Sequence, residues 1–487
     1  MTIDVTPGPH GVAVRAPELD ACPPVEAAEA LRTLPGLVLL DSARPGRRAR
    51  WTYLAADPVA VVDEVEPGAE PFATARTLLR RMAPGPGPGS AADGPPFAGG
   101  LLGYLSYDLG RRFERLPSIA LADQALPEIR LALHDWVVAW DGWTGRAWVA
   151  GRAVDGDVGR SVGRLAEIRA RLAATARAGR PAPAVVRRTP AGPPRLAFTA
   201  ETDWAAWTAG VEAIRDAIAR GELYQANLSR RLVAPFAGDP WPRFRALRAG
   251  EPAFFSAYLD LGADPAGGAP RALLSASPEP FLAVTADGVV ATDPIKGTRP
   301  RGRTRDEDRA LARELLGSAK DRAENTMIVD VLRNDLGRAC APGSVRTPRL
   351  WRLERTRTVQ HLVSTVTGRL APGRDAFDLL GASFPGGSIT GAPKIRAMEL
   401  LEALEPVRRG PYTGAALWIG ADGAMGSSIL IRTFVADGRR LTLHVGGGIT
   451  WRSHPAAEWE ETRTKARGPL RAIGGWVTND EREVADG

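Results

Sequence analysis

Lysine is rare in this 487-residue chain, which marks the few that remain as candidates for chemistry. Lys and Arg together number 63, and 63 − 4 leaves 59 arginines. The four lysines are Lys296, Lys320, Lys394 and Lys465. An arginine stays protonated, whereas a lysine can lose its proton and attack as a neutral amine. Lys296 is the leading candidate, because proline and glycine in DPIKGTRPRG (293–302) predict a tight turn directly after a strand at 288–292. An ordinary surface lysine is the alternative.

Two predicted helices each carry a pair of acids three residues apart. Asp321 and Glu324 form the first pair, and the apolar stripe that continues beyond Glu324 turns this acid inward. Glu458 and Glu461 repeat the spacing, with Lys465 one turn further on. Paired carboxylates without His or Cys beside them suit Mg²⁺, which shares its coordination shell with an anionic substrate. The spacing alone is equally consistent with two ordinary charged helix surfaces that bind no metal.

Two glycine-rich segments could bind an anion. FPGGSITGAPK (384–394) precedes a predicted helix, and VGGGI (445–449) follows a predicted strand. Without side chains in the way, their backbone amides can approach a carboxylate. Neither segment has the spacing of a nucleotide-binding loop, so we expect carboxylate binding rather than ATP binding, with simple turns as the alternative.

The elements that must position these residues indicate an α+β fold with antiparallel sheets. Segments 83–96, 178–194 and 262–270 have linker composition. We predict an N-terminal region at 1–177, a linker at 178–198, a catalytic domain at 199–475 and a tail at 476–487. Helices are expected at 162–177, 204–220, 306–317, 319–333, 395–404 and 456–467. Strands are expected at 37–40, 135–140, 272–275, 414–419, 427–435 and 440–445.

Composition excludes several classes of protein. No apolar run reaches the roughly 20 residues of a membrane span, and no secretory leader begins the chain, so we expect a cytoplasmic protein that does not bind membranes. Cys22 and Cys340 are isolated, which argues against a disulfide framework or a zinc site. The net charge is +7, but the basic residues are interleaved with 56 acids, so we expect no nucleic-acid partner. A non-catalytic basic binding module is the alternative from another class.

Several ordered motifs together carry a family resemblance. They are YQANLS (224–229), SPE (277–279), PIKGTRPRG (294–302), ENTMIVDVLRNDLGR (324–338), and the segments 384–398 and 446–465. This set resembles the chorismate-utilising enzymes, and most closely their aminodeoxychorismate synthase component I branch, densely over about 200–470 and weakly before that. The resemblance implies the anthranilate synthase component I-like fold: two large, face-packed antiparallel sheets flanked by helices.

The resemblance also implies how substrate and metal are bound. Glu324 and Glu461 would hold Mg²⁺, with Asp321 and Glu458 acting through water, and the metal would hold the ring carboxylate of chorismate. The remaining substrate-binding positions would be Thr298, Tyr412, Arg432, Gly446, Gly447, Gly448 and Lys465. Of these, Tyr412, Arg432 and the amides of Gly447 and Gly448 would hold the enolpyruvyl carboxylate.

The catalytic positions implied by the resemblance are Glu279, Lys296, His361 and Gln225. Glu279 would act as general acid at C4. Lys296 would attack C2 as a neutral amine, the form that desolvation and nearby cations such as Arg299 favour. His361 would lie beside the ring. Anthranilate synthases generally have Ala at position 296, and isochorismate or salicylate synthases have a water-activating Lys at position 225. Lys296 with Gln225 therefore favours ammonia as nucleophile and 4-amino-4-deoxychorismate, for p-aminobenzoate and folate supply, as product.

Partners and alternatives follow from the same resemblance. No glutaminase motif is present, so ammonia would come from a separate glutamine amidotransferase subunit, component II. Asp41-Ser42 resembles a tryptophan-binding motif with Asp in place of Glu, which makes Ser42 a candidate tryptophan contact. The alternative reaction is that of anthranilate synthase component I, which releases anthranilate and pyruvate.

Overall fold

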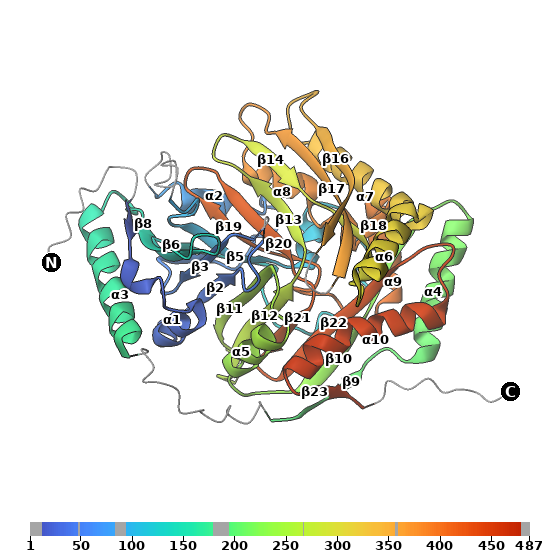
Figure 1. The fold of residues 1–487 in the computed structure, drawn as a ribbon, viewed down its shortest axis with the longest axis horizontal. Helices are drawn as coiled ribbons and strands as arrows, with labels where there is room; N and C mark the ends of the chain where they lie inside the picture. Colours follow the sequence, from blue (N-terminus) through green and yellow to red (C-terminus); the bar gives the residue numbers. More distant parts are fainter. Residues whose placement is uncertain are drawn as a thin grey trace.

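Two large sheets form the centre of the protein, and helices cover their outer faces (Figure 1). The computed structural model describes residues 12–46, 49–82, 94–178, 194–265, 267–355 and 359–478. Neighbouring strands run antiparallel, except that β23 runs parallel to β9. The first sheet has 13 strands among the described residues and the second has 10.

The strands of the first sheet follow one another in space in an order unlike their order in sequence. They are β1 (Val12–Arg15), β8 (Ala147–Gly151), β7 (Trp136–Asp141), β3 (Trp51–Ala55), β2 (Val38–Asp41), β11 (Phe255–Ala263), β12 (Pro270–Ser277), β21 (Thr433–Asp437), β22 (Arg440–Ile449), β10 (Gln225–Pro235), β9 (Leu196–Ala200) and β23 (Gly475–Val477), with β18 (Gly391–Ala392) beside β10.

The second sheet contains the predicted nucleophile on its edge. Its order is β15 (Ile295–Pro300), β17 (Val359–Arg369), β14 (Val289–Thr292), β13 (Pro280–Val284), β20 (Met425–Ile429), β19 (Ala415–Gly420), β5 (Gly100–Leu105), β6 (Ile129–His134) and β4 (Ala60–Val62), with β16 (Arg346–Arg355) also paired to β17.

Among the described residues, six helices overlap the predicted segments, with ends that differ by up to five residues, and four others were not predicted. The helices are α1 (Pro24–Leu31), α2 (Ala73–Leu79), α3 (Val158–Ala178), α4 (Trp204–Ala219), α5 (Trp241–Gly250), α6 (Arg305–Gly317), α7 (Ala319–Gly337), α8 (Ala376–Ser383), α9 (Lys394–Leu404) and α10 (Pro455–Ala472). Within the described residues, none of them is both long enough and apolar enough to cross a bilayer.

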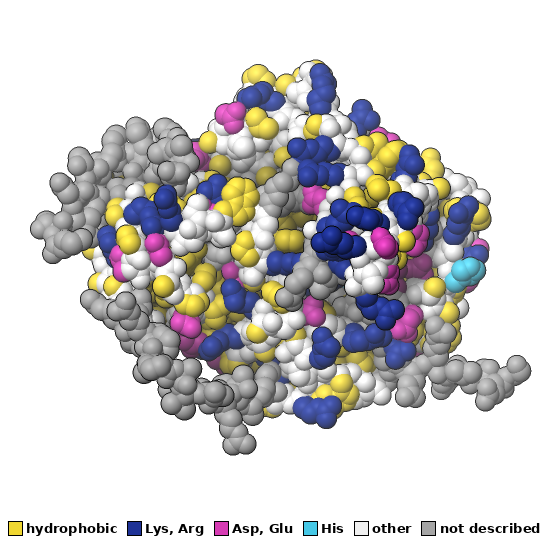
Figure 2. Space-filling view, in the orientation of Figure 1, with side chains coloured by type: hydrophobic (Ala, Val, Ile, Leu, Met, Phe, Trp, Pro, Cys, Tyr) yellow, Lys and Arg dark blue, Asp and Glu magenta, His cyan; other side chains and the backbone are white. Residues whose placement is uncertain are grey.

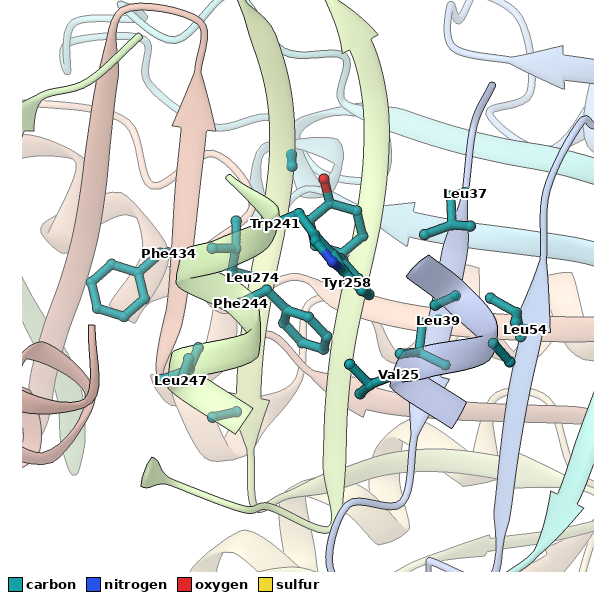
Figure 3. Packing of buried hydrophobic residues seen from close by; sticks show 14 of the residues in the cluster. Val25, Leu37, Leu39, Leu54, Trp241, Phe244, Leu247, Tyr258, Leu274 and Phe434 are labelled. Atoms are coloured by element: carbon teal, nitrogen blue, oxygen red, sulfur yellow. The ribbon is translucent and has the colours of Figure 1, made fainter. Parts of the chain in front are cut away.

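Strand alternation separates the two faces of the first sheet. On β11, Tyr258 belongs to the apolar cluster beneath α5, whereas Leu259 belongs to the layer between the two sheets. Figure 3 shows Trp241 and Phe244 of α5 beside Tyr258, and the Trp241 and Tyr258 rings meet edge to face with their centroids 4.9 Å apart. The inner layer also contains Tyr104 of β5, so the two sheets pack face to face as expected.

Both sheets combine strands from either side of the predicted linker. β2 pairs with β11 in the first sheet, and β5 pairs with β19 in the second. The predicted boundaries at 177 and 199 stay a prediction, and the expected linkers at 83–96 and 178–194 lie mostly outside the described residues. The third expected linker, 262–270, is the loop of the β11–β12 hairpin.

Three local predictions were wrong. The segment 427–435, predicted as one strand, is two strands in different sheets, because the chain turns at Arg432, whose φ is 51°. Lys296 does not lie in a tight turn but in β15, where a bulge absorbs Gly297 at φ 78°. Gly446–Gly448 do not form a loop: they belong to β22 and pair with β10.

Surface charge is spread rather than concentrated. On the face shown in Figure 2, Lys and Arg side chains are distributed over most of the described surface, with acidic and apolar side chains between them. This pattern is typical of a solvated protein surface rather than a continuous track for a polyanion.

Candidate active site

A cavity of about 1530 Å³ opens where the two sheets meet α7 and α10. Every site residue predicted from the sequence lines it, with Ser42 as the exception. The walls come from β10 and β22 of the first sheet and from β15 and β17 of the second. Residues far apart in sequence are therefore brought to one place by sheet topology.

Ser388 connects the candidate nucleophile to the candidate acid. The Lys296 Nζ donates a hydrogen bond to the Ser388 carbonyl oxygen at 3.1 Å. The Ser388 hydroxyl donates to Glu279 Oε1 at 3.0 Å. Asn227 Nδ2 also donates to the Ser388 carbonyl, at 3.1 Å. This single residue therefore orients both reactive groups.

Burial shifts the two reactive groups towards their neutral forms. Desolvation raises the pKa of Glu279, and the charges of Lys296 and Lys465 only partly oppose this. Desolvation lowers the pKa of Lys296, and the Lys465 charge adds to the effect. Arg299, the cation expected to help, instead donates to Asp321 and Glu314. The cavity thus favours a protonated acid beside an unprotonated amine.

His361 is held at the cavity wall by its neighbour on the adjacent strand. Thr298 of β15 is paired with His361 of β17, and the Thr298 hydroxyl lies 2.8 Å from His361 Nδ1. This hydrogen bond fixes the orientation of the imidazole ring. Thr298 and His361 therefore act as a pair on the wall that carries Lys296.

Four carboxylates from two helices converge on the same cavity. Burial raises the pKa of Glu324, and the charges of Asp321 and Glu461 raise it further. Burial likewise raises the pKa of Glu458, whose Oε1 accepts a hydrogen bond of 2.6 Å from Ser453. Burial alone would raise the pKa of Glu461, but Lys465, 2.7 Å away, and other lysines outweigh it and hold it below the usual value. These acids face one another closely enough to repel.

The glycines of β22 leave room for those acids. A Cβ at Gly447 would lie 3.3 Å from Glu458 Oε2 and 3.4 Å from Glu461 Oε1. A Cβ at Gly448 would lie 2.3 Å from Gln225 Nε2. Any larger residue at these positions would fill the space that a ligand needs, so the missing side chains keep the strand surface open.

Tyr412 and Arg432 also line the cavity. The Tyr412 ring is stacked on His444 at 5.0 Å, and burial raises the pKa of Tyr412 to about 12, so its hydroxyl stays a donor. Arg432 is exposed, and its guanidinium lies 3.9 Å from Glu251. A substrate carboxylate would therefore compete with Glu251 for Arg432.

Comparison with known proteins decides the family. The family model of the chorismate binding enzymes matches residues 39–471. The chain belongs to the chorismate-binding enzymes. It is 41% identical over 461 residues to anthranilate synthase component 1 of Streptomyces coelicolor, covering 93% of this chain and 84% of the relative. It is also 41% identical over 384 residues to aminodeoxychorismate synthase component 1 of Klebsiella aerogenes, covering 78% of each.

A solved structure agrees with this assignment. The crystal structure of anthranilate synthase component I from Streptococcus pneumoniae superposes with a TM-score of 0.72 at 29% identity, covering 87% of this chain and 93% of that chain. The predicted α+β fold is therefore confirmed. The protein is a chorismate-utilising enzyme of the anthranilate or aminodeoxychorismate synthase type.

The carboxylates of this chorismate-binding enzyme fit Mg²⁺. Among the described residues no group of three or more His, Cys, Asp or Glu side chains is preassembled around one point. Mg²⁺ does not require one, because it is usually bound through one or two carboxylates plus water and substrate oxygens. The negative charges of Glu324 and Glu461 repel each other, and a divalent cation held by both would offset this repulsion.

Of the predicted site residues Gln225 and Ser42, the first lines the cavity and the second does not. Gln225 is buried in its wall and donates to Asn227 Oδ1 at 3.3 Å, while its own Oε1 has no hydrogen-bond partner. Ser42 lies outside the cavity, where its hydroxyl donates to the Trp51 carbonyl at 2.8 Å. Its neighbour Asp41 forms an ion pair with Arg248. Tryptophan binding at Ser42 stays a prediction.

Some residues of the site act through backbone atoms or through tertiary contacts, and the sequence does not predict them. Ser388 and Asn227 lie within motifs that were noticed for their glycines and for Gln225, and neither had a signal of its own. Arg44 and Phe254 also line the cavity, although neither was predicted as a site residue. Only the fold shows that they share this space.

Proposed function

We propose that this enzyme is component I of an aminodeoxychorismate synthase. It would convert chorismate and ammonia to 4-amino-4-deoxychorismate, using Mg²⁺. The observation that carries the proposal is the buried amine of Lys296, with its pKa lowered, linked through Ser388 to Glu279, with its pKa raised. The similarity to the Klebsiella enzyme supports this reaction, and the similarity to the Streptomyces enzyme makes anthranilate formation the alternative.

Binding would fix both carboxylates of chorismate. Bound Mg²⁺, held by Glu324 and Glu461, would neutralise the ring carboxylate and fix it in place. Tyr412, Arg432 and the open surface of Gly447 line the cavity and would take the enolpyruvyl carboxylate. With both ends fixed, the ring would lie between Lys296 of β15 and Glu279, which lies in the connection between β12 and β13.

The chemistry would proceed in two displacements that balance. The Lys296 amine attacks C2 of the ring, the two ring double bonds shift, and the C4 hydroxyl leaves as water with the proton of Glu279. Ammonia then attacks C4, the double bonds shift back, and the C2–N bond breaks to release Lys296. The enolpyruvyl group at C3 is retained throughout. Lys296 leaves as a neutral amine, and the ammonium group formed at C4 loses one proton, which returns Glu279 to its acid form.

The product distinguishes the two candidate reactions. Purified enzyme incubated with chorismate, Mg²⁺ and ammonium is expected to give an aminated ring that still carries its enolpyruvyl side chain, identified by mass spectrometry. Anthranilate together with pyruvate would overturn the proposal. Turnover with glutamine in place of ammonium is expected only after a glutamine amidotransferase subunit is added, because no glutaminase motif occurs in the chain.

Removing the metal, or one of its ligands, is expected to stop turnover. EDTA should abolish chorismate consumption and Mg²⁺ should restore it. Glu461→Gln should weaken Mg²⁺ binding at least about 100-fold, the upper end of the loss seen when a group that merely orients a metal ligand is mutated. Glu460→Gln is the matched control, because Glu460 lies on the same helix but pairs with Arg463 and Arg467. Calorimetric titration with Mg²⁺ measures both, and equal affinities for the two variants would contradict the metal site.

A further inference from the structure

A buried ion pair behind the cavity holds three of its wall segments together. The pair consists of Glu405, at the end of α9, and Arg409, and both side chains are buried. Neither residue lines the cavity. Any effect of Glu405 and Arg409 on the reaction would therefore be transmitted through other residues.

All five N–H groups of Arg409 have acceptors. Its Nε and Nη2 donate to the two oxygens of Glu405, at 2.8 and 2.7 Å. Nη1 donates to the Ile389 carbonyl at 3.1 Å and to the Thr413 hydroxyl at 3.3 Å. Nη2 also donates to the Asn227 carbonyl. A lysine has three donors in a different geometry and could not satisfy this set.

Three of these acceptors belong to different walls of the cavity. Asn227 lies on β10, Ile389 on the turn that contains Ser388, and Thr413 directly after Tyr412. Arg409 therefore joins a strand of the first sheet to the two loops that pass beside the substrate space. Its guanidinium also lies 4.7 Å from the centre of the Tyr107 ring, which fixes it from the other side.

The bonds continue from Arg409 to the reactive groups. Asn227, held by its carbonyl, uses its side-chain amide to hold the Ser388 carbonyl. Ser388 in turn accepts from Lys296 and donates to Glu279. The chain of contacts is continuous, and each link is 3.1 Å or shorter.

We propose that Arg409, held by Glu405, is a positioning residue for the reaction: it sets the distance between Lys296, Glu279 and the substrate without touching any of them. This rests on the proposed roles of Lys296 and Glu279. Its readout, chorismate consumption, can be measured whichever product forms.

The test is Arg409→Lys, which keeps the charge but loses the planar set of donors. Turnover of chorismate at saturating Mg²⁺ and ammonium is expected to fall about 10- to 100-fold in kcat, because displacement of a reacting group by about 1 Å costs on the order of 10²-fold. The KM for chorismate should change less than about 3-fold, since the groups that hold the two carboxylates remain. A kcat unchanged from wild type would overturn the proposal.

Arg231→Lys is the matched control. Arg231 is equally buried on β10 and donates to both Asp123 and Glu201, but none of these three lines the cavity. Thermal denaturation should show both variants folded with lowered Tm, and only Arg409→Lys should lose kcat. Equal kcat losses in the two variants would show a general effect of burial and would also overturn the proposal.

A milder variant covers the case in which Arg409→Lys does not fold. Ser229→Ala removes only the hydroxyl that donates to Glu405 Oε1 at 2.8 Å and leaves the backbone bond of 2.9 Å from the same residue. A several-fold fall in kcat with unchanged KM is expected. Wild-type kcat in Ser229→Ala, with Arg409→Lys unfolded, would count against positioning. If the wild-type enzyme forms anthranilate, the proposed function is wrong. The kcat values of the variants relative to wild type still test whether Arg409 positions groups in the cavity.

Discussion

Lys296→Ala is expected to lower the formation of aminated product by at least roughly 10³-fold, because removing a covalent nucleophile removes the step that it carries. Chromatographic assay of chorismate consumption and product measures this. Arg at the same position tests the alternative that only positive charge is needed, because arginine keeps the charge but cannot provide a neutral amine. Both variants should be inactive. Activity in Lys296→Arg near that of wild type would refute the nucleophile.

Binding separates a catalytic defect from a damaged site. Both Lys296 variants should still bind chorismate in a Mg²⁺-dependent manner, since Glu324, Glu461 and Tyr412 are unchanged. Loss of binding together with turnover would instead assign Lys296 to substrate recognition.

Glu279→Gln is expected to lower kcat about 10²- to 10⁴-fold, the usual contribution of a positioned general acid. The leaving hydroxyl at C4 would then depart without a proton donor. Stopped assays of chorismate consumption measure the loss. A fall of less than about 3-fold would show that another group supplies the proton.

The pH profile tests the same residue independently. In the wild type, activity should fall at acid pH because Lys296 must be neutral, and its lowered pKa extends the neutral form to lower pH. Activity should also fall at alkaline pH because Glu279 must be protonated, and its raised pKa extends the protonated form to higher pH. Glu279→Gln should therefore lose the alkaline fall and keep the acid one. An alkaline limb that persists in this variant would belong to a different group.

Chemistry in this chain was easier to predict than geometry. Lys296 could be selected because lysine is rare, and the acids of α7 and α10 could be selected by their spacing, since both signals lie in local sequence. Ser388 could not be selected, because it acts partly through its backbone carbonyl, which every residue has. Arg409 is one of 59 arginines, and only tertiary contacts distinguish it.

Two of the three wrong local predictions have a common cause. Glycine was interpreted as a turn at 297 and as a loop at 446–448, whereas in both places the strand continues and the glycine makes room for a neighbour. At Gly297 the space is taken by Asp321, 2.9 Å from where a Cβ would be. At Gly447 it is needed beside Glu458 and Glu461. In these strands glycine allows a neighbouring side chain to approach the backbone closely and does not mark a change in chain direction.

The pairing of β2 with β11 and of β5 with β19 gives the chain an architecture that cannot be taken apart. Cutting between the two sequence regions would expose strand edges in the middle of both sheets, where unpaired N–H and C=O groups invite aggregation. The N-terminal region is therefore no detachable appendage that could be exchanged between relatives as a unit. Whatever a ligand does to the strands near Ser42 would reach the catalytic strands through shared backbone hydrogen bonds, with no hinge between them.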